Sequence, residues 1–492
     1  MSQPSAQASA YDLVEYPSKP IRDCQPVRMA SIAALAGLTP PSFETGTVVD
    51  LGCGSAANLI AIAAAYPGIT AIGVDPSAEA IASGRELIEQ AGLQNVTLVQ
   101  DTRTPLDDGQ ADYVMAHGVL SWVDDDTRAE VIAEAARIAG EGALLFFSYN
   151  AEPGALPRFV SRWIGRRVGG RQIAAGDAPG AHAAMVERLA LGAGQASTGA
   201  PYAQVAARQH RYIEGRDAYG LFHDELNENW AVLSVSALAA QIGAHGLGYV
   251  GECLPADRWR TWITPEVAEQ IADAAGPDPA AQQQQIDDLS GAPFHDSLFV
   301  KGTAPAPAPG GLATVPTGYP AANWHLRWIG GDAPEGVDAE GAAVIGAVQQ
   351  AEAVGLTIAE AAEQTGLDPD VVLARASLLD ARKLLTLAVG GPPAAAAPGE
   401  LPVASPLVRA QVRAGHESVS SLRHRSITVE HGALRELIPL LDGTRDRTAL
   451  AQFLEESNLV PAGTDAAELV ELCLTTICRS GLLVPAGATQ EA

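Results

Sequence analysis

One acidic residue and two glycines near residue 50 have the types and spacing of a nucleoside-binding turn. The run Thr47-Val-Val-Asp-Leu-Gly-Cys-Gly54 places Asp50 after two apolar residues, with Gly52 and Gly54 directly behind it. Glycine lets the backbone approach a ligand closely because it has no Cβ. A helix of small residues follows at 57–65, and the free N–H groups at its start attract a polar ligand. The stretch predicts a buried strand, a tight turn and a helix around a small molecule, and the alternative is a turn that only reverses the chain.

Two further acidic residues follow apolar stretches that read as strands. The first stretch, 69–74, ends at Asp75, and the second, 96–100, ends at Asp101 and Thr102. A carboxylate at the end of the second strand of such a unit can accept both hydroxyl groups of a ribose. A carboxylate after the third strand can accept the exocyclic amine of adenine. Together these residues predict a site for a cofactor that carries adenosine.

Two classes of cofactor fit this turn. A dinucleotide site has the pattern Gly-x-Gly-x-x-Gly, and Ala57 would occupy its third glycine position. The S-adenosylmethionine (SAM) site of methyltransferases has the pattern acid-x-Gly-x-Gly, which residues 50–54 match at every fixed position. Ala56 stands where a third glycine is usual in that pattern. The full match favours SAM, and a dinucleotide remains the alternative.

The elements that must position these residues alternate between strands and helices. Two more strands are expected at 111–116 and 143–147, with a helix between them from about residue 126 to residue 139. Five strands with ligand-type residues at their carboxyl ends are typical of an open parallel sheet. The predicted fold class is therefore α/β, with a Rossmann-like class I methyltransferase sheet. A mixed middle domain and C-terminal winged-helix-like units are expected to follow the sheet.

Pro-rich stretches and local patterns divide the 492-residue chain into the following expected parts. They are a SAM-binding methyltransferase domain with an N-terminal lid at 1–165, a middle or regulatory domain at 166–302, a linker at 303–313, a winged-helix-like domain at 314–390, a linker at 391–400 and a second winged-helix-like domain at 401–492. The linkers are assigned from their Pro-rich composition. Acidic residues outnumber basic ones in the first winged-helix pattern, which disfavours a role in reading DNA.

Composition excludes some partners and compartments. The net charge of −27 repels phosphate backbones, so no nucleic-acid partner is expected. No apolar run reaches the roughly 18 residues of a membrane span, and the start of the sequence has no secretory pattern. Five scattered cysteines without metal-ligand spacing favour a reduced, cytoplasmic location and no metal. A metal site built from His223 and His295, each of which precedes an aspartate, is the weaker alternative.

These residues together resemble a bacterial family, the class I SAM-dependent methyltransferases with a methyltransferase regulatory domain, which includes the rickettsial-type protein-lysine methyltransferases. The motifs that carry the resemblance are Tyr11-Asp12 with Tyr16, Asp50–Gly54 with Asn58, Asp75, Ala116–Val119 with Ser121-Trp122, Ser148–Asn150 with Pro153-Gly154, Phe222–Asp224, Gly251-Glu252, and Pro402–Pro406 with Leu440–Asp446. The family turn usually continues Asp-Gly-Gly-Asn after the second glycine, whereas this chain has Ser55-Ala-Ala-Asn58. Small residues keep room for the cofactor, with one charge fewer beside it.

The resemblance implies methyl transfer from SAM to a basic protein or peptide, with a lysine amine as the acceptor, and it leaves a homodimer open. The alternatives are a biosynthetic N- or O-methyltransferase that acts on a small molecule or peptide natural product, and a non-catalytic SAM-binding scaffold. The expected cofactor-binding residues are Asp50, Gly52, Gly54, Asn58, Asp75, Pro76, Ser77, Asp101, Thr102 and Ala116. The expected residues of the acceptor channel are His117, Tyr149, Trp122, Tyr11 and Tyr16, with His117 either a general base or a structural residue.

Overall fold

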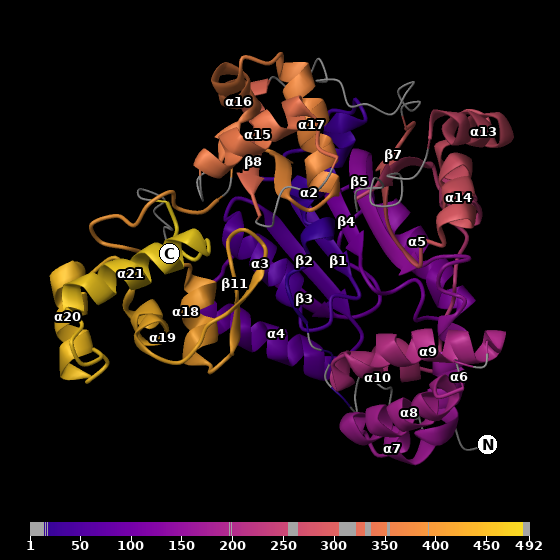
Figure 1. The fold of residues 1–492 in the computed structure, drawn as a ribbon, viewed down its shortest axis with the longest axis horizontal. Helices are drawn as coiled ribbons and strands as arrows, with labels where there is room; N and C mark the ends of the chain where they lie inside the picture. Colours follow the sequence, from indigo (N-terminus) through magenta and orange to yellow (C-terminus); the bar gives the residue numbers. More distant parts are fainter. Residues whose placement is uncertain are drawn as a thin grey trace.

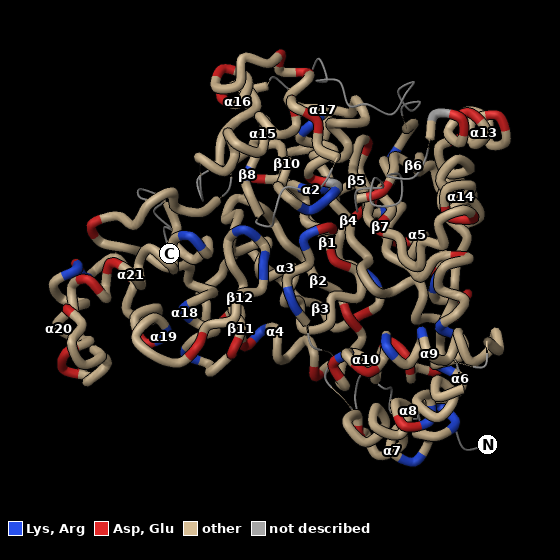
Figure 2. Tube along the Cα trace, viewed as in Figure 1, with Lys and Arg blue, Asp and Glu red and all other residues tan. Residues whose placement is uncertain are grey.

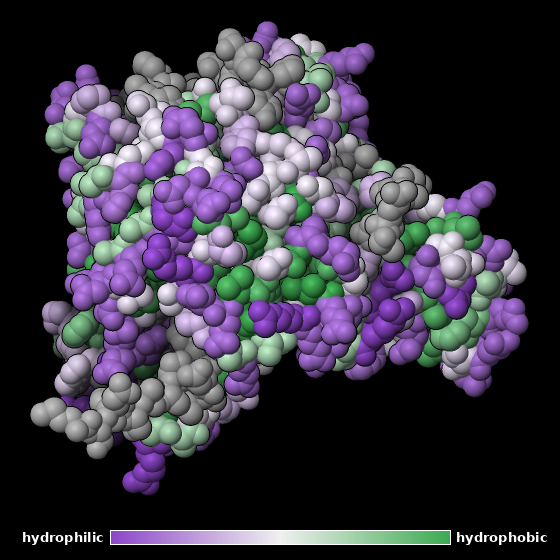
Figure 3. Space-filling model, turned by 180° about the vertical axis from the view of Figure 1, so that it is seen from behind, coloured by the Kyte–Doolittle hydropathy of each residue, from purple (hydrophilic) through white to green (hydrophobic). Residues whose placement is uncertain are grey.

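The computed structural model has a central sheet, a helical insertion and two C-terminal units (Figure 1). It describes residues 14, 16, 18–195, 197, 199–253, 264–304, 321–329, 336–351, 355–391 and 393–485. Acidic residues are frequent on the outer helices α13 (Pro265–Ala275), α16 (Ile358–Thr365) and α20 (Arg447–Glu456), as Figure 2 shows. From behind, the surface is mostly hydrophilic, with smaller hydrophobic areas between (Figure 3).

A seven-stranded sheet forms the centre, in the order β3-β2-β1-β4-β5-β7-β6. The strands are β1 (Thr47–Leu51), β2 (Thr70–Asp75), β3 (Val96–Gln100), β4 (Ala111–Ala116), β5 (Ala139–Asn150), β6 (Leu247–Glu252) and β7 (Phe294–Lys301). The first five are parallel, and β7 is antiparallel to both of its neighbours. The predicted α/β class with a Rossmann-like sheet is confirmed. Because the strand order reverses between β1 and β4, their carboxyl ends open a crevice there.

The sheet takes its last two strands from the region expected to be a separate middle domain. Both β6 and β7 lie within 166–302, yet β7 pairs with β5 along seven residues. Leu298 and Phe299 of β7 belong to the two cores on either side of the sheet. The boundary at residue 165 therefore does not enclose the whole sheet, because β5 pairs on one side with β7, which begins only at Phe294.

Alternating side chains bury both faces of the sheet. Val48 points into one core and Val49 into the other, as successive residues of a strand must. The first core includes α2 (Pro26–Leu35) and α3 (Ala57–Ala65). The second core includes α5 (Asp125–Ile138), α11 (Val235–Gly243) and α14 (Pro279–Ser290). The crevice is thus held on a sheet that is rigid on both sides.

A helical insertion follows β5. It consists of α6 (Arg158–Val168), α7 (Gly170–Ala174), α8 (Ala178–Ala193), α9 (Pro201–Glu214) and α10 (Ala218–Leu226). Its small core includes Met185, Leu189 and Phe222, and Val14 from the N-terminal segment packs into it. The insertion therefore ties the start of the described chain to the region beside the sheet.

The first C-terminal unit has the elements of a winged helix. A sheet in the order β10-β8-β9 is built from β8 (Trp324–Trp328), β9 (Leu356–Thr357) and β10 (Leu385–Val389). The helices are α15 (Ala339–Gln350), α16 and α17 (Pro369–Ala381). Thr357 and Glu360 form a capping box at the start of α16. Buried Trp324 and Leu385 share one core with α2, so this unit is packed onto the sheet domain.

The second C-terminal unit contains α18 (Pro406–Arg413), β11 (Ser418–Ser420), β12 (Ser426–Thr428), α19 (Ala433–Leu437), α20 and α21 (Ala466–Arg479). It has a core of its own, to which α18 and α21 contribute. Its helix α18 also contacts α4 (Ala78–Ala91) of the sheet domain. Across the described ranges, no helix is both long and apolar enough to span a membrane.

Candidate active site

A cavity of about 1180 Å³ opens at the carboxyl ends of β1, β2 and β4. Twelve of the residues singled out in the sequence line it: Tyr16, Asp50, Gly52, Gly54, Asn58, Asp75, Pro76, Ser77, Asp101, Thr102, His117 and Trp122. They come from loops that lie far apart in the sequence. The parallel strand order brings these loops to one edge, as expected for an open α/β sheet.

The glycine turn is held in a shape that needs glycine. Gly52 and Gly54 have φ angles of 76° and 56°, which L side chains rarely adopt. A Cβ on Gly52 would lie 2.6 Å from Cγ2 of Val119 across the cavity wall. The amides of Gly52 and Cys53 both donate to the carbonyl of Val74, at 2.8 and 3.1 Å. The turn is thus anchored to β2 and leaves a narrow slot beside Val119.

Asp75 faces this slot. Its Oδ2 accepts a hydrogen bond of 2.8 Å from the amide of Gly54, and its Oδ1 accepts one of 2.9 Å from the amide of Ser77. Each carboxylate oxygen has two lone pairs, so both can accept a second donor from the cavity. The carboxylate is therefore oriented by the backbone and has capacity for two hydroxyl groups.

Asp50 lies beneath the turn and is buried. Burial, with a smaller contribution from the charge of Asp75, raises the pKa of Asp50 to about 7. A raised pKa means that the charged form lacks a favourable partner in the unliganded protein. A cationic ligand group beside Asp50 would favour the carboxylate.

Asp101 and Thr102 lie at the end of β3. Oδ1 of Asp101 accepts hydrogen bonds from the amides of Thr102, at 2.6 Å, and Arg103, at 3.2 Å. These bonds fix the carboxylate of Asp101 at an exposed rim of the cavity. Its other oxygen accepts no hydrogen bond from the described part of the chain.

His117 lies on the wall of the cavity after β4. Burial, together with the positive charge of Lys19, lowers the pKa of His117 to about 4. Its ring stacks on Phe146 with centroids 6.1 Å apart. The next residue, Gly118, donates its amide to Oγ of Ser148 at 2.8 Å, which ties the loop to β5. A neutral, fixed imidazole is the species present near pH 7.

Two aromatic side chains flank the cavity. The Tyr16 ring meets the edge of His223 at 5.4 Å, which links the N-terminal segment to α10. Burial, then the charge of Asp224, raises the pKa of Tyr16 to about 12. Arg162 lies over the Trp122 ring, 5.5 Å from its centroid. Arg158 also lies over the Trp122 ring, 5.9 Å from its centroid, so two guanidinium groups flank this ring.

Asn58 lines the cavity, but its side-chain amide bonds to other parts of the chain. Its Oδ1 accepts a hydrogen bond of 2.9 Å from the amide of Ile21 and another of 2.7 Å from Nε2 of His424. Its Nδ2 donates to Sγ of Cys24 at 3.2 Å. Asn58 therefore joins α3, the N-terminal segment and the second C-terminal unit.

Two predicted residues that the structure describes, Ala116 and Tyr149, do not line the cavity. Ala116 is buried within β4. Tyr149 is also buried, and its hydroxyl lies 2.9 Å from Oγ of Ser297. Side chains alternate along β5. Because the side chain of Ser148 faces the cavity loop, that of Tyr149 points to the opposite face of the sheet. Tyr11 lies outside the described residues.

The cavity also has charged residues that sequence reasoning missed: Lys19, Arg103, Glu130, Glu134, Arg137 and Asp224. Asp224 belongs to the Phe222–Asp224 motif and forms an ion pair with Arg216. The motif marked Asp224 as a residue of interest. The sequence did not show that Asp224 lies beside a cavity formed by the N-terminal half of the chain.

The two His-Asp pairs do not come together. His295 of β7 bonds Asp287 at 2.7 Å and Glu252 at 3.0 Å. Burial opposes its charge, but these two carboxylates raise the pKa of His295 to about 10. His223 instead lies in α10 beside Tyr16. Among the residues that the structure describes, no group of three or more His, Cys, Asp or Glu residues has a metal-binding arrangement.

Three family models match separate parts of the chain. Residues 48–142 match a methyltransferase domain, residues 217–301 a predicted methyltransferase regulatory domain, and residues 400–459 the C-terminal winged helix domain of PKMT. The resemblance seen in the sequence is confirmed by these matches.

Relatives from Rickettsia match longer parts. The chain is 35% identical over 147 residues to uncharacterized protein RP028 of Rickettsia prowazekii and 26% identical over 296 residues to RP789 of the same organism. These matches cover 59% and 53% of the two relatives, so the chain spans little more than half of their length. The structure of PKMT2 from Rickettsia typhi, solved also in complex with AdoHcy, has the same fold. Its TM-score is 0.76 at 20% identity, over 95% of this chain and all of PKMT2.

Proposed function

We propose that this chain, in which a methyltransferase domain, a predicted methyltransferase regulatory domain and a PKMT winged helix domain follow one another, is a SAM-dependent methyltransferase that acts on a protein. The observation that carries the proposal is the cavity in which Asp75 faces the glycine turn. PKMT2 from Rickettsia typhi binds AdoHcy on the same fold, which supports SAM over a dinucleotide. The proposed substrate is a protein, and within it we propose a lysine amine as the group that accepts the methyl.

The residues present fit SAM. The slot at Gly52 admits a ligand only because no Cβ fills it. Asp75 would bind the ribose hydroxyls, and Asp101 with Thr102 would lie at the adenine. Asp50 would balance the positive charge of the methionyl end. A buried carboxyl group with a pKa of about 7 becomes charged more readily when such a cation lies beside it. Pro76 and Ser77 would border the ribose.

When bound, SAM supplies a methyl group on a sulfonium, which an incoming lone pair attacks in line. The task of this chain is to align a neutral amine with that methyl group. A lysine amine has an unperturbed pKa of about 10.4, and a dry, partly apolar channel lowers it by disfavouring the ammonium. Trp122 and Tyr16 would line this channel.

His117 is better suited to position the acceptor than to remove its proton. A base whose pKa is about 4 holds few protons at neutral pH, so it takes one from an ammonium group inefficiently. As a neutral imidazole held by Phe146 stacking, it can instead accept or donate one fixed hydrogen bond.

The acidic residues around the cavity support a basic substrate. Glu130 and Asp224 line the cavity in a protein with a net charge of −27, which attracts cationic peptides and disfavours nucleic acid. A cytoplasmic location and a homodimer stay predictions, for which fractionation and light scattering are the respective measurements.

Calorimetric titration with SAM and its demethylated product tests the cofactor. Asp75→Ala should weaken binding tenfold or more, equivalent to about 1.4 kcal/mol, because two backbone-oriented acceptors are lost. Asp273→Ala, on exposed α13, removes the same charge away from the cavity and should bind as the wild type does. Binding of NADH in place of SAM would overturn the assignment.

Labelled SAM and a cell lysate test the acceptor. Label in a protein band, mapped by mass spectrometry to lysine, is the expected result. Label confined to small molecules would favour a biosynthetic N- or O-methyltransferase. SAM binding without any transfer would favour the non-catalytic scaffold.

A further inference from the structure

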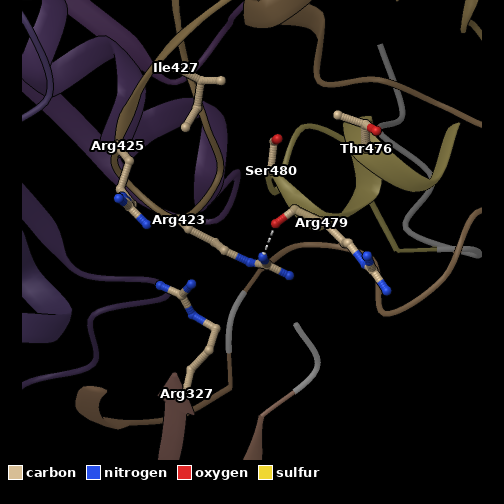
Figure 4. A pocket seen from close by; sticks show the side chains of 7 residues that line it. All are labelled: Arg327, Arg423, Arg425, Ile427, Thr476, Arg479 and Ser480. Carbon is tan, nitrogen blue, oxygen red and sulfur yellow. Dashed lines mark hydrogen bonds between the residues drawn. The ribbon is translucent and has the colours of Figure 1, made fainter. Parts of the chain in front are cut away.

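A second pocket lies between the two C-terminal units and is lined mainly by arginine. It has a volume of about 290 Å³. Arg327 comes from β8, Arg423 and Arg425 from the turn between β11 and β12, and Arg479 from the end of α21. Figure 4 shows the side chains of Arg327, Arg423 and Arg425 gathered on one side, with Arg479 on the other. Ser480 and Thr476 add hydroxyl groups to the lining.

The backbone holds one of these arginines in place. Nη1 of Arg423 donates to the carbonyl of Arg479 at 2.6 Å, at the carboxyl end of α21 (Figure 4). Gly481 has a φ of 73°, and a Cβ there would lie 2.8 Å from Cδ of Arg423. The chain therefore leaves room for the Arg423 stem and fixes one face of its guanidinium. Arg423 also lines the pocket.

The charges in the pocket repel one another. Burial, and then the charges of Arg423, Arg425 and Arg22, lower the pKa of Arg327 to about 9. Arg22 itself is paired with Asp380 at 2.6 Å. Considering the described residues alone, neither Arg327 nor Arg425 forms an ion pair with a carboxylate. A cluster of like charges in a protein with a net charge of −27 is costly unless an anion offsets it.

His424, which lies between Arg423 and Arg425 in the sequence, connects the pocket to the active-site cavity. His424 is buried, has a left-handed φ of 55°, and donates from Nε2 to Oδ1 of Asn58 at 2.7 Å. The donor assignment follows because the amide of Ile21 also bonds this atom of Asn58, which identifies it as the oxygen. Burial lowers the pKa of His424 to about 4, so its ring is neutral. The 423–425 turn is thus hydrogen-bonded to a residue that lines the active-site cavity.

We propose that this pocket binds a small phosphate-bearing anion and that its occupancy is transmitted to the active-site cavity through the His424–Asn58 hydrogen bond. Arginine forks match phosphate oxygens in pairs, and hydroxyl groups such as that of Ser480 add further donors. The pocket has room for more than one phosphate group, which makes pyrophosphate the suitable probe. The binding site is independent of the proposed function, whereas the transmitted effect rests on it.

Calorimetric titration of the full chain with pyrophosphate, without SAM, tests the site. The wild type should bind, and the double variant Arg327→Gln/Arg425→Gln should bind at least tenfold more weakly. The control, Arg171→Gln/Arg188→Gln, removes two exposed arginines of α7 and α8 and should bind as the wild type does. Absence of binding by the wild type, or equal losses in both double variants, would overturn the site.

Thermal unfolding separates a binding role from a structural one. Without an anion, Arg327→Gln should unfold at a higher temperature than the wild type, because it removes a half-buried charge among like charges. It should also lose the increase in melting temperature that pyrophosphate gives the wild type. A lower melting temperature, with the pyrophosphate effect retained, would show that Arg327 only supports the fold.

The transmitted effect is tested by titrating SAM with and without saturating pyrophosphate. The affinity of the wild type for SAM should change at least threefold, and His424→Ala should abolish the change while still binding pyrophosphate. An unchanged affinity in the wild type would overturn the transmission and leave the site intact. If SAM does not bind at all, the proposed function fails, whereas the pyrophosphate titration still decides the pocket.

Discussion

The carboxyl group of Asp50, at the glycine turn, has a pKa of about 7 instead of the ordinary 3.8. Burial is the main cause and Asp75 the second. The raised pKa of Asp50 determines how stability and ligand affinity change with pH. Without ligand, the folded protein loses stability as the pH rises from about 4 to about 7, because the charge must be buried. The affinity for a cationic ligand increases as the pH rises towards and through about 7, because the carboxylate form of Asp50 becomes populated.

SAM affinity should therefore rise with pH. If the carboxylate form of Asp50 is the one that binds, the dissociation constant should fall about tenfold between pH 6 and pH 8. Asp50→Asn should bind more weakly and show no such dependence. Titration calorimetry at several pH values measures both, and a flat profile for the wild type would contradict the role given to Asp50.

Gly52 is a second residue whose change should be felt at once. Gly52→Ala places a Cβ 2.6 Å from Val119 and requires a left-handed alanine, which costs roughly 1–2 kcal/mol. SAM binding should weaken tenfold or more while the protein stays folded. Adding Val119→Ala should restore part of the affinity because it removes the clash but not the backbone strain. No recovery in the double variant would show that the slot beside Val119 is not where the ligand binds.

At the scale of elements, one buried aspartate fastens α17 to α2. Asp380 bonds Arg28 at 2.7 Å and Arg22 at 2.6 Å, and Arg28 also donates to the carbonyl of Cys253 at 2.9 Å. Burial opposes the charge of Asp380, but the two arginines hold its pKa below the usual 3.8. Its contribution to stability is therefore present above about pH 4 and is lost as the pH falls further.

Asp380→Asn should destabilise the protein by about 3 kcal/mol, because it leaves the buried guanidinium of Arg28 without its charge partner. Glu363→Gln, which removes an exposed charge of α16, is the matched control and should change stability little. Urea unfolding measures both. A loss no larger for Asp380→Asn than for the control would show that apolar packing alone joins the first C-terminal unit to the sheet domain.

Local patterns predicted the elements that nearby residues determine. The glycine turn, Asp75 and Asp101 were predicted because each follows its own strand, and the parallel order then brings them together. Tyr149 was misplaced because the sequence shows the end of β5 but not which face each residue takes, which Ser148 decides by bonding Gly118. Strand β7 was assigned to another domain because its partner β5 ends at Asn150, far before β7 begins at Phe294, and β6 was assigned with it because β6 pairs with β7.

At the scale of the molecule, one hydrophobic core runs from the sheet domain into the first C-terminal unit. Met29 of α2, Leu59 of α3 and Trp324 of β8 all belong to it. The second C-terminal unit has its own core, although Leu407, Ala410 and Leu422 of this unit belong to the shared one. These two cores, and not the Pro-rich stretches between them, set which parts unfold together.

Hydrogen exchange should follow these cores. Amides of α3 and of β10 should become exchangeable together as denaturant is added, because both lie in the shared core. Amides of α21 should exchange at a lower or separate threshold. Mass spectrometry of exchanged peptides measures this order. Loss of protection in β10 well before α3 would show that the first C-terminal unit unfolds independently.

The amide of Asn58 has a consequence for relatives of other lengths. Its side-chain oxygen accepts hydrogen bonds from Ile21, earlier in the chain, and from His424, 366 positions later. A homologue that ends before such a histidine would present this oxygen with one donor fewer. In shorter homologues, this asparagine can therefore be replaced by other small or polar residues. Asparagine at this position should occur mainly in homologues that have the second C-terminal unit.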